Sequence, residues 1–430
     1  MICEMVSSSH QESPLDLANN CFPDDGPVLV NQTGRSDGYV SLRQALQSAE
    51  SAKAVNLLVD NNSNWIYSFG RLGLYEIPLD DLTLTLSRVL QPIYSLVNDS
   101  LSTVDRDFNR HGLEEHVLPV DRRGRSLIRD FFGSGIYNFS FTERRERNLI
   151  IAVLTHDIGN LCNRTGHELT AVKILERVLP ELTESTDDWL AIKRAITNHD
   201  ENQAEAQVLP IIHQAIKGEI NSQILLAEVK QLMGEEGLVL FVSDKTDVGT
   251  RRVGLKAGKQ AGVVDNDQHV VANLLMETKS VDYSGLDLRW VLDFTPQPAN
   301  EQEAEQLSAC VRPRSSGNGN RWHVPEAMRN LYRNHGISHF DAAKNRFMNL
   351  YFDRIRMAIL CGLALTDGGK FELTLRDLID AGGDGSYYTI KTTQDTLLEW
   401  FKKGGFWAKK FFDKKKLFDN LTGMILAGIF

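Results

Sequence analysis

The feature that most constrains how this chain can fold is an apolar run that ends in an adjacent histidine and aspartate. Residues 149–154 read Leu-Ile-Ile-Ala-Val-Leu, and a break in the pattern follows at Gly159. Between them lie His156 and Asp157. A run this apolar is expected to be buried, so it brings an imidazole and a carboxylate to the rim of a core. Two ligands are too few for a metal ion, and a dipeptide alone is weak evidence for a site.

Other histidines and carboxylates lie at the ends of apolar or helical segments in the same way. They are His116 at the start of a segment that runs to residue 132, His167 at the start of a helical stretch, His199 at the end of another, and Asp244 at the end of the apolar run 240–243. His111 lies so near His116 that either residue could be the first of the series. The recurrence predicts that these side chains gather at one place on the core rim, as the ligands of a metal centre would.

Composition excludes several other classes of protein. With 430 residues the chain is expected to form two or three domains, and its net charge of −10 argues against nonspecific binding to nucleic acid. Its five cysteines are widely spaced and contain no Cys-x-x-Cys pair, as is typical of reduced thiols in the cytoplasm. We see neither a secretory signal nor an apolar stretch of membrane-spanning length, so we expect a cytoplasmic protein.

The pattern of turns and apolar periods predicts a mainly α protein with two smaller mixed regions. From the N-terminus the predicted units are a disordered tail at 1–25, a small α/β module at 26–78, a helical domain at 79–295, a linker at 296–320, a C-terminal helix-plus-strand (α+β) region at 321–396 and a basic, aromatic tail at 397–430. The α/β module is expected to contain strands at 27–31, 54–60 and 65–70 and a helix at 41–49. The C-terminal region is expected to contain a helix ending at 365 and strands at 370–375 and 387–391.

Within the helical domain, helices are predicted at 80–97, 116–132, 143–157, 168–179, 187–199, 205–217 and 219–233. The short apolar run 237–243 is different, because its composition alone indicates a buried strand.

The order His, His-Asp, His, His, Asp resembles the HD-domain superfamily, the metal-dependent phosphohydrolases named for their His-Asp pair. The resemblance covers about residues 116–250. It is strongest in four stretches, Leu-Thr-His-Asp-Ile-Gly-Asn at 154–160, His-Glu-Leu-Thr-Ala at 167–171, Ile-Thr-Asn-His-Asp-Glu at 196–201 and Ser-Asp-Lys-Thr-Asp-Val at 243–248. A looser similarity to bacterial HD-domain proteins without an agreed substrate continues through 251–253, 267–273 and 351–354.

The resemblance implies an all-helical HD-domain bundle, so residues 237–247 are expected to be a helix after all. It implies a role for each matching residue. The metal ligands would be His116, His156, Asp157, His167, His199 and Asp244. Asp157, His167 and His199 would also take part in catalysis, and His167 and His199 would hold a second metal or the substrate phosphate. The donor set suits one or two ions of Mn²⁺, Fe²⁺, Co²⁺ or Ni²⁺. Lys245, Arg251 and Arg252 follow closely and could bind substrate phosphates.

The expected function is a metal-dependent phosphohydrolase that cleaves a phosphoester of a nucleotide or cyclic nucleotide through a metal-activated water. The run after Asn160 lacks the Gly-Tyr-Pro signature of cyclic-di-GMP phosphodiesterases, and no Glu-Asp pair follows His-Asp as in alarmone hydrolases, so the sequence does not identify the substrate. An alternative is a signalling module that uses the HD fold to bind a nucleotide without turnover.

Expected partners are a small-molecule phosphoester and no specific nucleic acid. The tail at 397–430 combines lysines with aromatic residues, so it could contact an anionic membrane surface weakly, although a docked helix with its lysines in water is the favoured interpretation. The sequence leaves the oligomeric state open.

Overall fold

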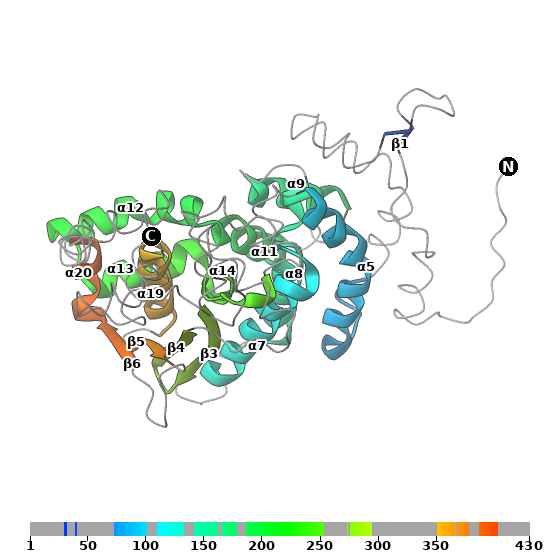
Figure 1. Ribbon diagram of the computed structural model, residues 1–430. Coiled ribbons are helices and arrows are strands. Elements are labelled where there is room, and N and C mark those ends of the chain that lie inside the picture. The colour runs from blue at the N-terminus through cyan, green and yellow to red at the C-terminus, as the bar shows by residue number, and fades with distance from the viewer. Residues whose placement is uncertain are drawn as a thin grey trace, which may run out of the picture.

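The computed structural model describes most of the predicted helical domain and parts of the flanking regions. The described residues are 30–31, 39–40, 73–100, 110–132, 142–161, 166–178, 186–252, 273, 276–294, 351–366, 369–377 and 387–402. Among them helices predominate, and Figure 1 shows these helices beside one small sheet. The mainly α class is therefore confirmed for this part of the chain.

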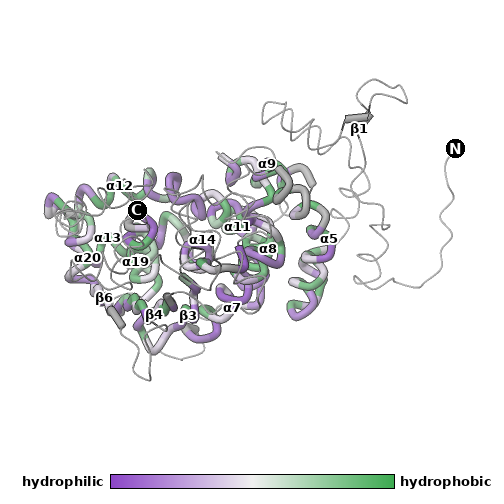
Figure 2. The backbone as a smooth tube through the Cα atoms, in the orientation of Figure 1, coloured by the Kyte–Doolittle hydropathy of each residue, from purple (hydrophilic) through white to green (hydrophobic). Residues whose placement is uncertain are grey.

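The predicted helices between residues 79 and 233 are present with small shifts of their ends. They are α5 (Leu79–Ser100), α7 (Leu118–Phe132), α8 (Glu143–Thr155), α9 (His167–Val178), α11 (Thr186–His199), α12 (Glu201–Lys217) and α13 (Ser222–Met233). Three short helical segments, η1 (Leu113–Val117), η2 (Ile158–Leu161) and η3 (Thr250–Arg252), extend or connect them. Hydrophobic and hydrophilic residues alternate along helices such as α5 and α12 in Figure 2, as the helical period predicted.

The run 237–243 is helical, so the strand interpretation from composition is wrong and the expectation from the resemblance is correct. It lies in α14 (Glu235–Lys245), every residue of which is buried. α14 packs against α7, α8, α11 and α19 (Phe352–Thr366), so it has no solvent face. A helix that is covered on all sides loses the apolar period that identifies helices in a sequence.

Helices α8, α11 and α14 run in the same direction. Ion pairs and a hydrogen bond join their N-terminal parts. Arg145 on α8 lies 2.5 Å through Nη1 from Glu235 Oε2 and 2.7 Å through Nε from Glu236 Oε1, both at the start of α14. Asn148 on α8 donates from Nδ2 to Asp188 Oδ1, near the start of α11, at 2.8 Å. Because the N-terminal parts of the three helices meet, their C-terminal ends also lie together.

A four-stranded sheet lies along the lower edge of the molecule in Figure 1. Its strands, in spatial order, are β3 (Met276–Ser284), β4 (Asp287–Phe294), β5 (Lys370–Asp377) and β6 (Tyr387–Thr393). The outer pairs are antiparallel and the central pair is parallel, with Leu288 opposite Phe371. The predicted strands at 370–375 and 387–391 are confirmed. α7 packs on β3, and α19 packs on β4 and β5.

The β3–β4 hairpin corrects the expectation that residues 79–295 are entirely helical. Its two-residue turn begins at Gly285, whose φ of 64° falls in the left-handed region that favours glycine. Through β4 and β5 the hairpin joins the range assigned to the helical domain to the range assigned to the C-terminal region. The helix predicted to end at 365 is α19, which packs against both the sheet and α14.

Several predictions fall mainly outside the described residues. In the N-terminal module, β1 (Val30–Asn31) pairs antiparallel with β2 (Tyr39–Val40), and the predicted helix 41–49 and strands at 54–60 and 65–70 lie outside. The tail 1–25 and the linker 296–320 also lie outside. The start of the C-terminal tail belongs to α20 (Gln394–Lys402). None of the described helices combines the length and apolarity needed to cross a bilayer.

Candidate metal centre

Asp157 lies at the centre of a buried cluster of histidines and carboxylates. It follows the C-terminal end of α8, and its residue is 2% exposed. The cluster also contains the ends of the two helices that run parallel to α8, because His199 ends α11 and Asp244 lies in the last turn of α14. Carbonyl groups at helix C-termini carry partial negative charge, so three such ends favour a cation between them.

The Oδ2 atom of Asp157 faces a first group of ligands, which we define as His116, His156, Asp157 and Asp244. His116 Nε2 and His156 Nε2 each lie 3.4 Å from Asp157 Oδ2. His116 Nε2 also lies 3.1 Å from Asp244 Oδ1. Three of these ligand atoms, from His116, His156 and Asp244, lie within 4.8 Å of one another, which suits a single ion.

The Oδ1 atom of Asp157 faces a second group, which we define as Asp157, His167 and His199. His167 Nε2 lies 3.3 Å from Asp157 Oδ1, and His199 Nε2 lies 3.7 Å from the same atom. The two histidine Nε2 atoms are 2.9 Å apart. Two imidazole lone pairs at that distance would repel, so the pair requires a shared proton or a cation.

Hydrogen bonds on the outer nitrogen fix the rings of three histidines. His156 Nδ1 lies 2.6 Å from the carbonyl of Val153, and His199 Nδ1 lies 2.5 Å from the carbonyl of Ile196. Because a carbonyl only accepts, Nδ1 carries the proton and Nε2 of each ring presents a lone pair to the cluster. His116 Nδ1 lies 2.7 Å from Asp247 Oδ2, the carboxylate–histidine arrangement typical of metal ligands.

The inner nitrogens of His116 and His156 test whether the first group fits a metal. Within the described part of the chain, both Nε2 atoms are buried and have no hydrogen-bond partner. A buried lone pair without a donor is unfavourable unless something absent from the protein satisfies it. Two such nitrogens beside two carboxylates form a donor set that a divalent transition metal would satisfy.

The charges of the cluster suit this chemistry. Burial lowers the pKa of His156 to about 3, although Asp157 opposes the shift, so the ring is neutral at neutral pH. Burial would raise the pKa of Asp157, but His156 and His111 outweigh it and the pKa falls well below its usual value. The pKa of Asp244 is lowered in the same way, chiefly by Lys245 and His116, against the effect of burial. Neutral histidines and ionised carboxylates are the forms that bind metals.

Close packing at Gly159 brings His167 to Asp157. A Cβ at Gly159, in η2, would lie 1.8 Å from the His167 carbonyl oxygen and 2.7 Å from Ala171 N, so only glycine lets α9 pack this closely. Asn160, also in η2, donates from Nδ2 to Asp157 Oδ1 at 2.8 Å. The Gly-Asn sequence therefore positions both the second group and its carboxylate.

His111 lies beside the first group and has a partner on each nitrogen. Its Nδ1 lies 2.5 Å from Asp157 Oδ2, and its Nε2 lies 3.3 Å from Arg252 Nη2. A guanidinium only donates, so His111 Nε2 accepts, and His111 Nδ1 carries the proton and donates a hydrogen bond to Asp157. In this arrangement His111 orients Asp157, and His116 is the one that presents a free lone pair to the cluster.

The predicted substrate-binding residues lie around the first group. Lys245 Nζ is 2.7 Å from Asp244 Oδ2. Arg251 pairs with Asp247, and its Nη1 lies 3.1 Å from Glu277 Oε1. Arg252 donates to the Asp247 carbonyl at 3.1 Å. All six predicted metal ligands thus lie in one cluster with Lys245, while Arg251 and Arg252 form the layer behind it. Their binding of substrate stays a prediction.

Two residues of the cluster were not assigned a role from the sequence. Asp247 anchors His116 and also accepts from Arg123 Nη1 at 3.0 Å, and Asn160 holds Asp157. Both lie in the stretches that carry the resemblance, so their position three residues after Asp244 and Asp157 was the available signal. His167 also belongs to a further grouping with Glu168 and Asp200, which overlaps the second group.

Comparison with known proteins adds no relative to these observations. No protein-family model matches the chain, and no curated protein or solved structure matches it either. What is established is that the described part of the chain is mainly helical and contains a buried His and Asp cluster that could hold a metal ion.

Proposed function

We propose that the protein is a metal-dependent phosphohydrolase of the HD-domain type, which cleaves a phosphoester of a nucleotide or cyclic nucleotide. One observation carries the proposal. The two oxygens of Asp157 face different pairs of histidine nitrogens, as a carboxylate that bridges two neighbouring metal ions would. The order of the ligands along the chain and their origin at helix ends support the same assignment.

The first group would hold one divalent ion and the second group another. Such ions would supply a low-pKa water and neutralise phosphate oxygens, which are two of the requirements of phosphoester hydrolysis. The chain's own residues would set the geometry. His116 and His156 are fixed by their outer hydrogen bonds, and Asp157 is held by His111 and Asn160. Lys245 lies beside Asp244, where its ammonium would bind a phosphate oxygen.

The experiment that tests the proposal joins metal analysis to a hydrolysis screen on the same sample. We expect purified protein to contain Mn, Fe, Co or Ni at one to two ions per chain, as the two groups imply, and to hydrolyse at least one nucleotide or cyclic nucleotide. The matched control is His213→Ala, because His213 lies on α12 with an exposed side chain. This variant should keep both properties.

The outcomes separate the proposal from its alternative. A protein that binds no metal after incubation with Mn²⁺ and hydrolyses nothing in a broad nucleotide panel would contradict it. A protein that binds metal and a nucleotide tightly without turnover would support the non-catalytic signalling module instead.

A further inference from the structure

Two carboxylates, those of Glu168 and Asp200, lie next to the second group. Glu168 is in the first turn of α9, directly after His167, and Asp200 caps the start of α12, directly after His199. Glu168, Asp200 and His167 each offer one ligand atom, and these three atoms lie within 4.8 Å of one another. The two carboxylates therefore border the second group through His167, whose Nε2 lies 3.3 Å from Asp157 Oδ1.

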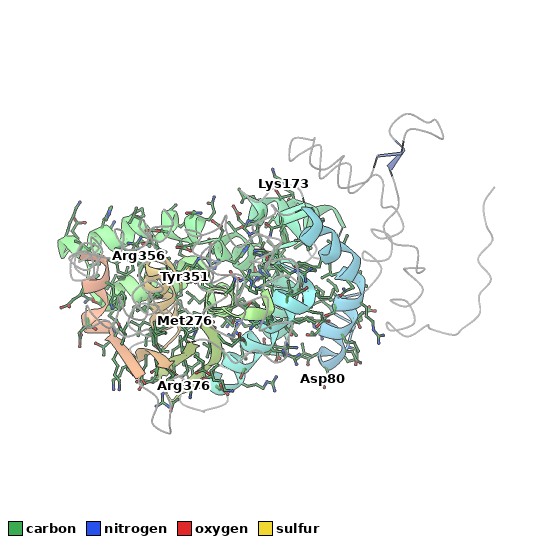
Figure 3. All side chains as sticks on the ribbon, viewed as in Figure 1. Asp80, Lys173, Met276, Tyr351, Arg356 and Arg376 are labelled. Carbon is green, nitrogen blue, oxygen red and sulfur yellow. The ribbon has the colours of Figure 1, made fainter. Side chains whose placement is uncertain are left out.

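Glu168 has a buried carboxylate oxygen that lacks a hydrogen bond. The residue is 1% exposed, and within the described part of the chain its Oε2 accepts no hydrogen bond. His167 Nδ1 lies 3.4 Å from this oxygen without forming a hydrogen bond to it. Lys173, on the same helix, is exposed and points outward from α9 in Figure 3. A carboxylate buried in this way is unfavourable unless a cation or a donor from outside the protein satisfies it.

Asp200 offers an oxygen to the same position. Its Oδ1 accepts hydrogen bonds from the N–H groups of Asn202 and Gln203, at 3.0 and 3.1 Å, as the side chain of a helix N-cap does. The cap uses Oδ1, so Oδ2 can serve another ligand. Burial raises the pKa of Asp200, but Lys245 and the Gln203 N–H outweigh it and lower the pKa, so the carboxylate is ionised at neutral pH. Asp200 is only half-buried, so water can complete the shell of an ion bound there.

Two other buried glutamates show how a protein usually satisfies such a charge. Glu235 and Glu236 are 6% and 5% exposed, and both pair with Arg145, at 2.5 and 2.7 Å. Among the residues that the structure describes, neither Glu168 nor Asp200 forms an ion pair with a lysine or arginine. The starts of α9 and α12 each add at most roughly half a positive charge, which does not balance two carboxylates. The position therefore keeps a net negative charge that a cation would neutralise.

We propose that Glu168 and Asp200 bind a Mg²⁺ ion beside the second group. This site goes beyond the proposed hydrolysis and does not depend on it. Mg²⁺ prefers oxygen ligands, keeps several waters and is typically held by one or two carboxylates, which matches one buried and one half-buried carboxylate. The ion needs no nitrogen ligand, so His167 would still face the second group through Nε2. The first and second groups, which are rich in histidine, suit transition metals instead.

The test titrates Mg²⁺ into full-length protein that has been loaded with Mn²⁺ and desalted, and it measures binding by isothermal titration calorimetry. We expect one Mg²⁺ per chain. Glu168→Gln removes one of the two charges and should weaken this event at least about 10-fold, because the lost attraction to a divalent ion is large even at high dielectric. Asp200→Asn should have the same effect, and asparagine is an equally good N-cap, so α12 should still form.

Glu176→Gln is the matched control for Glu168→Gln. Glu176 lies on the same helix, but its side chain is 37% exposed and pairs with Lys193 at 3.1 Å. This variant should bind Mg²⁺ within about twofold of the wild type, as expected for an exposed pair. His199→Ala should also keep the Mg²⁺ event, because it removes a ligand of the second group and not of this site. Melting temperature and Mn²⁺ content are measured for every variant, and Asp200→Asn decides if Glu168→Gln does not fold.

Three results would overturn the inference. The first is Mn²⁺-loaded wild type that binds no further Mg²⁺, and the second is equal Mg²⁺ affinity in Glu168→Gln and Glu176→Gln. The third is a Mg²⁺ event that His199→Ala abolishes and Glu168→Gln leaves intact, because the ion would then enter the second group. If Glu168→Gln weakens only the binding of Mn²⁺ to the second group, Glu168 orients His167 and binds no ion of its own.

The inference and the proposed function fail separately. If the wild type binds no Mn²⁺, Mg²⁺ is titrated into the metal-free protein, and the same variants decide. Nucleotide hydrolysis is measured on the same samples. A protein that binds Mg²⁺ through Glu168 and Asp200 but hydrolyses nothing overturns the proposed function alone, and a hydrolase in which neither variant changes Mg²⁺ binding overturns this inference alone.

Discussion

The first and second groups of the candidate metal centre share Asp157 and have two histidines each, but they differ in charge and in the contacts of those histidines. The first group adds a second carboxylate, Asp244, and two histidines whose inner nitrogens have no partner within the described residues. The second group adds only His167 and His199, whose Nε2 atoms face each other at 2.9 Å. The first group therefore offers a cation two negative charges, those of Asp157 and Asp244. The second group offers only the charge of Asp157, which it shares with the first group.

The difference predicts that, if the cluster binds metal, it has one tight and one weak cation position. Anionic oxygen ligands contribute most of the attraction for a divalent ion, so the first group should bind more tightly. His199 in the second group is anchored as closely as the rings of the first group, with Nδ1 2.5 Å from the Ile196 carbonyl, but the outer contacts of His116 and His167 differ. His116 is held by a carboxylate at 2.7 Å, whereas His167 Nδ1 lies 3.4 Å from Glu168 Oε2. A single ion should occupy the first group, and a second ion should follow at higher concentration.

Asp157→Asn should have the largest effect, because it removes the charge that both groups share. We expect loss of both ions and a fall in nucleotide hydrolysis of at least about 10³-fold, since a metal supplies several kcal/mol of transition-state stabilisation. Metal analysis and initial rates on the same sample measure both effects. If this variant kept two ions, Asp157 would not be the shared ligand.

His156→Ala and His199→Ala should separate the two groups. His156→Ala removes a ligand with a buried, unpartnered Nε2 from the tight position, so the first Mn²⁺ should bind weakly or not at all. His199→Ala should leave the first Mn²⁺ in place and abolish only the weaker binding event. Calorimetric titration with Mn²⁺ resolves the two events. Equal losses in both variants would mean that the two groups act as one site.

Asp247→Asn should weaken the first group without touching a ligand. Asp247 fixes His116 through Nδ1, and loss of such an outer carboxylate typically costs about 10- to 100-fold in metal affinity. Binding to the second group should change little. Asp247 also accepts hydrogen bonds from Arg123 and Arg251. The melting temperature of the metal-free variant is therefore needed to separate an effect on metal affinity from an effect on stability. Unchanged Mn²⁺ affinity would show that the His116 ring needs no anchor.

The sequence predicted the members of both groups but not the reason they meet. Each ligand lies at the end of an apolar or helical segment, and that pattern is local. Which ends come together depends on Arg145 with Glu235 and Glu236, and on Asn148 with Asp188, pairs that are 40 or more residues apart. Ion pairs of this kind cannot be distinguished in a sequence from ordinary exposed charges.

The same limit explains the parts of the fold that the sequence missed. The strands of β5 and β6 follow an alternating pattern and were predicted, but β3 and β4 were assigned to the helical domain. The parallel register of β4 with β5 joins Leu288 to Phe371 across a long stretch of chain, and such pairings leave no local pattern. Gly285 in a two-residue turn was a usable signal for the hairpin.

Asp121, a buried carboxylate outside the cluster, can be compared with Asp157. Among the substitutions considered, its replacement should affect metal binding least. Asp121 on α7 is 2% exposed, as Asp157 is. Burial raises the pKa of Asp121 to about 6, because Arg125 and the Thr83 hydroxyl only partly offset it. Asp157 has equal burial and a lowered pKa, since histidines surround it. Burial alone therefore does not make a carboxylate ready to bind a cation; its neighbours decide.

Asp121→Asn should consequently leave metal content unchanged and alter only stability. The folded pKa of about 6 lies above the ordinary value of 3.8, so wild-type stability is lost as pH rises between these values and stays reduced above 6. The uncharged amide avoids that loss. At pH 7.5 the variant should be more stable by about 3 kcal/mol, the order expected from a shift of this size, and the gain should shrink towards pH 4. Urea unfolding at both pH values measures the difference. A variant that is equally destabilised at both would show that the ionised Asp121 is well solvated or paired, and the difference in neighbours would then not be what separates it from Asp157.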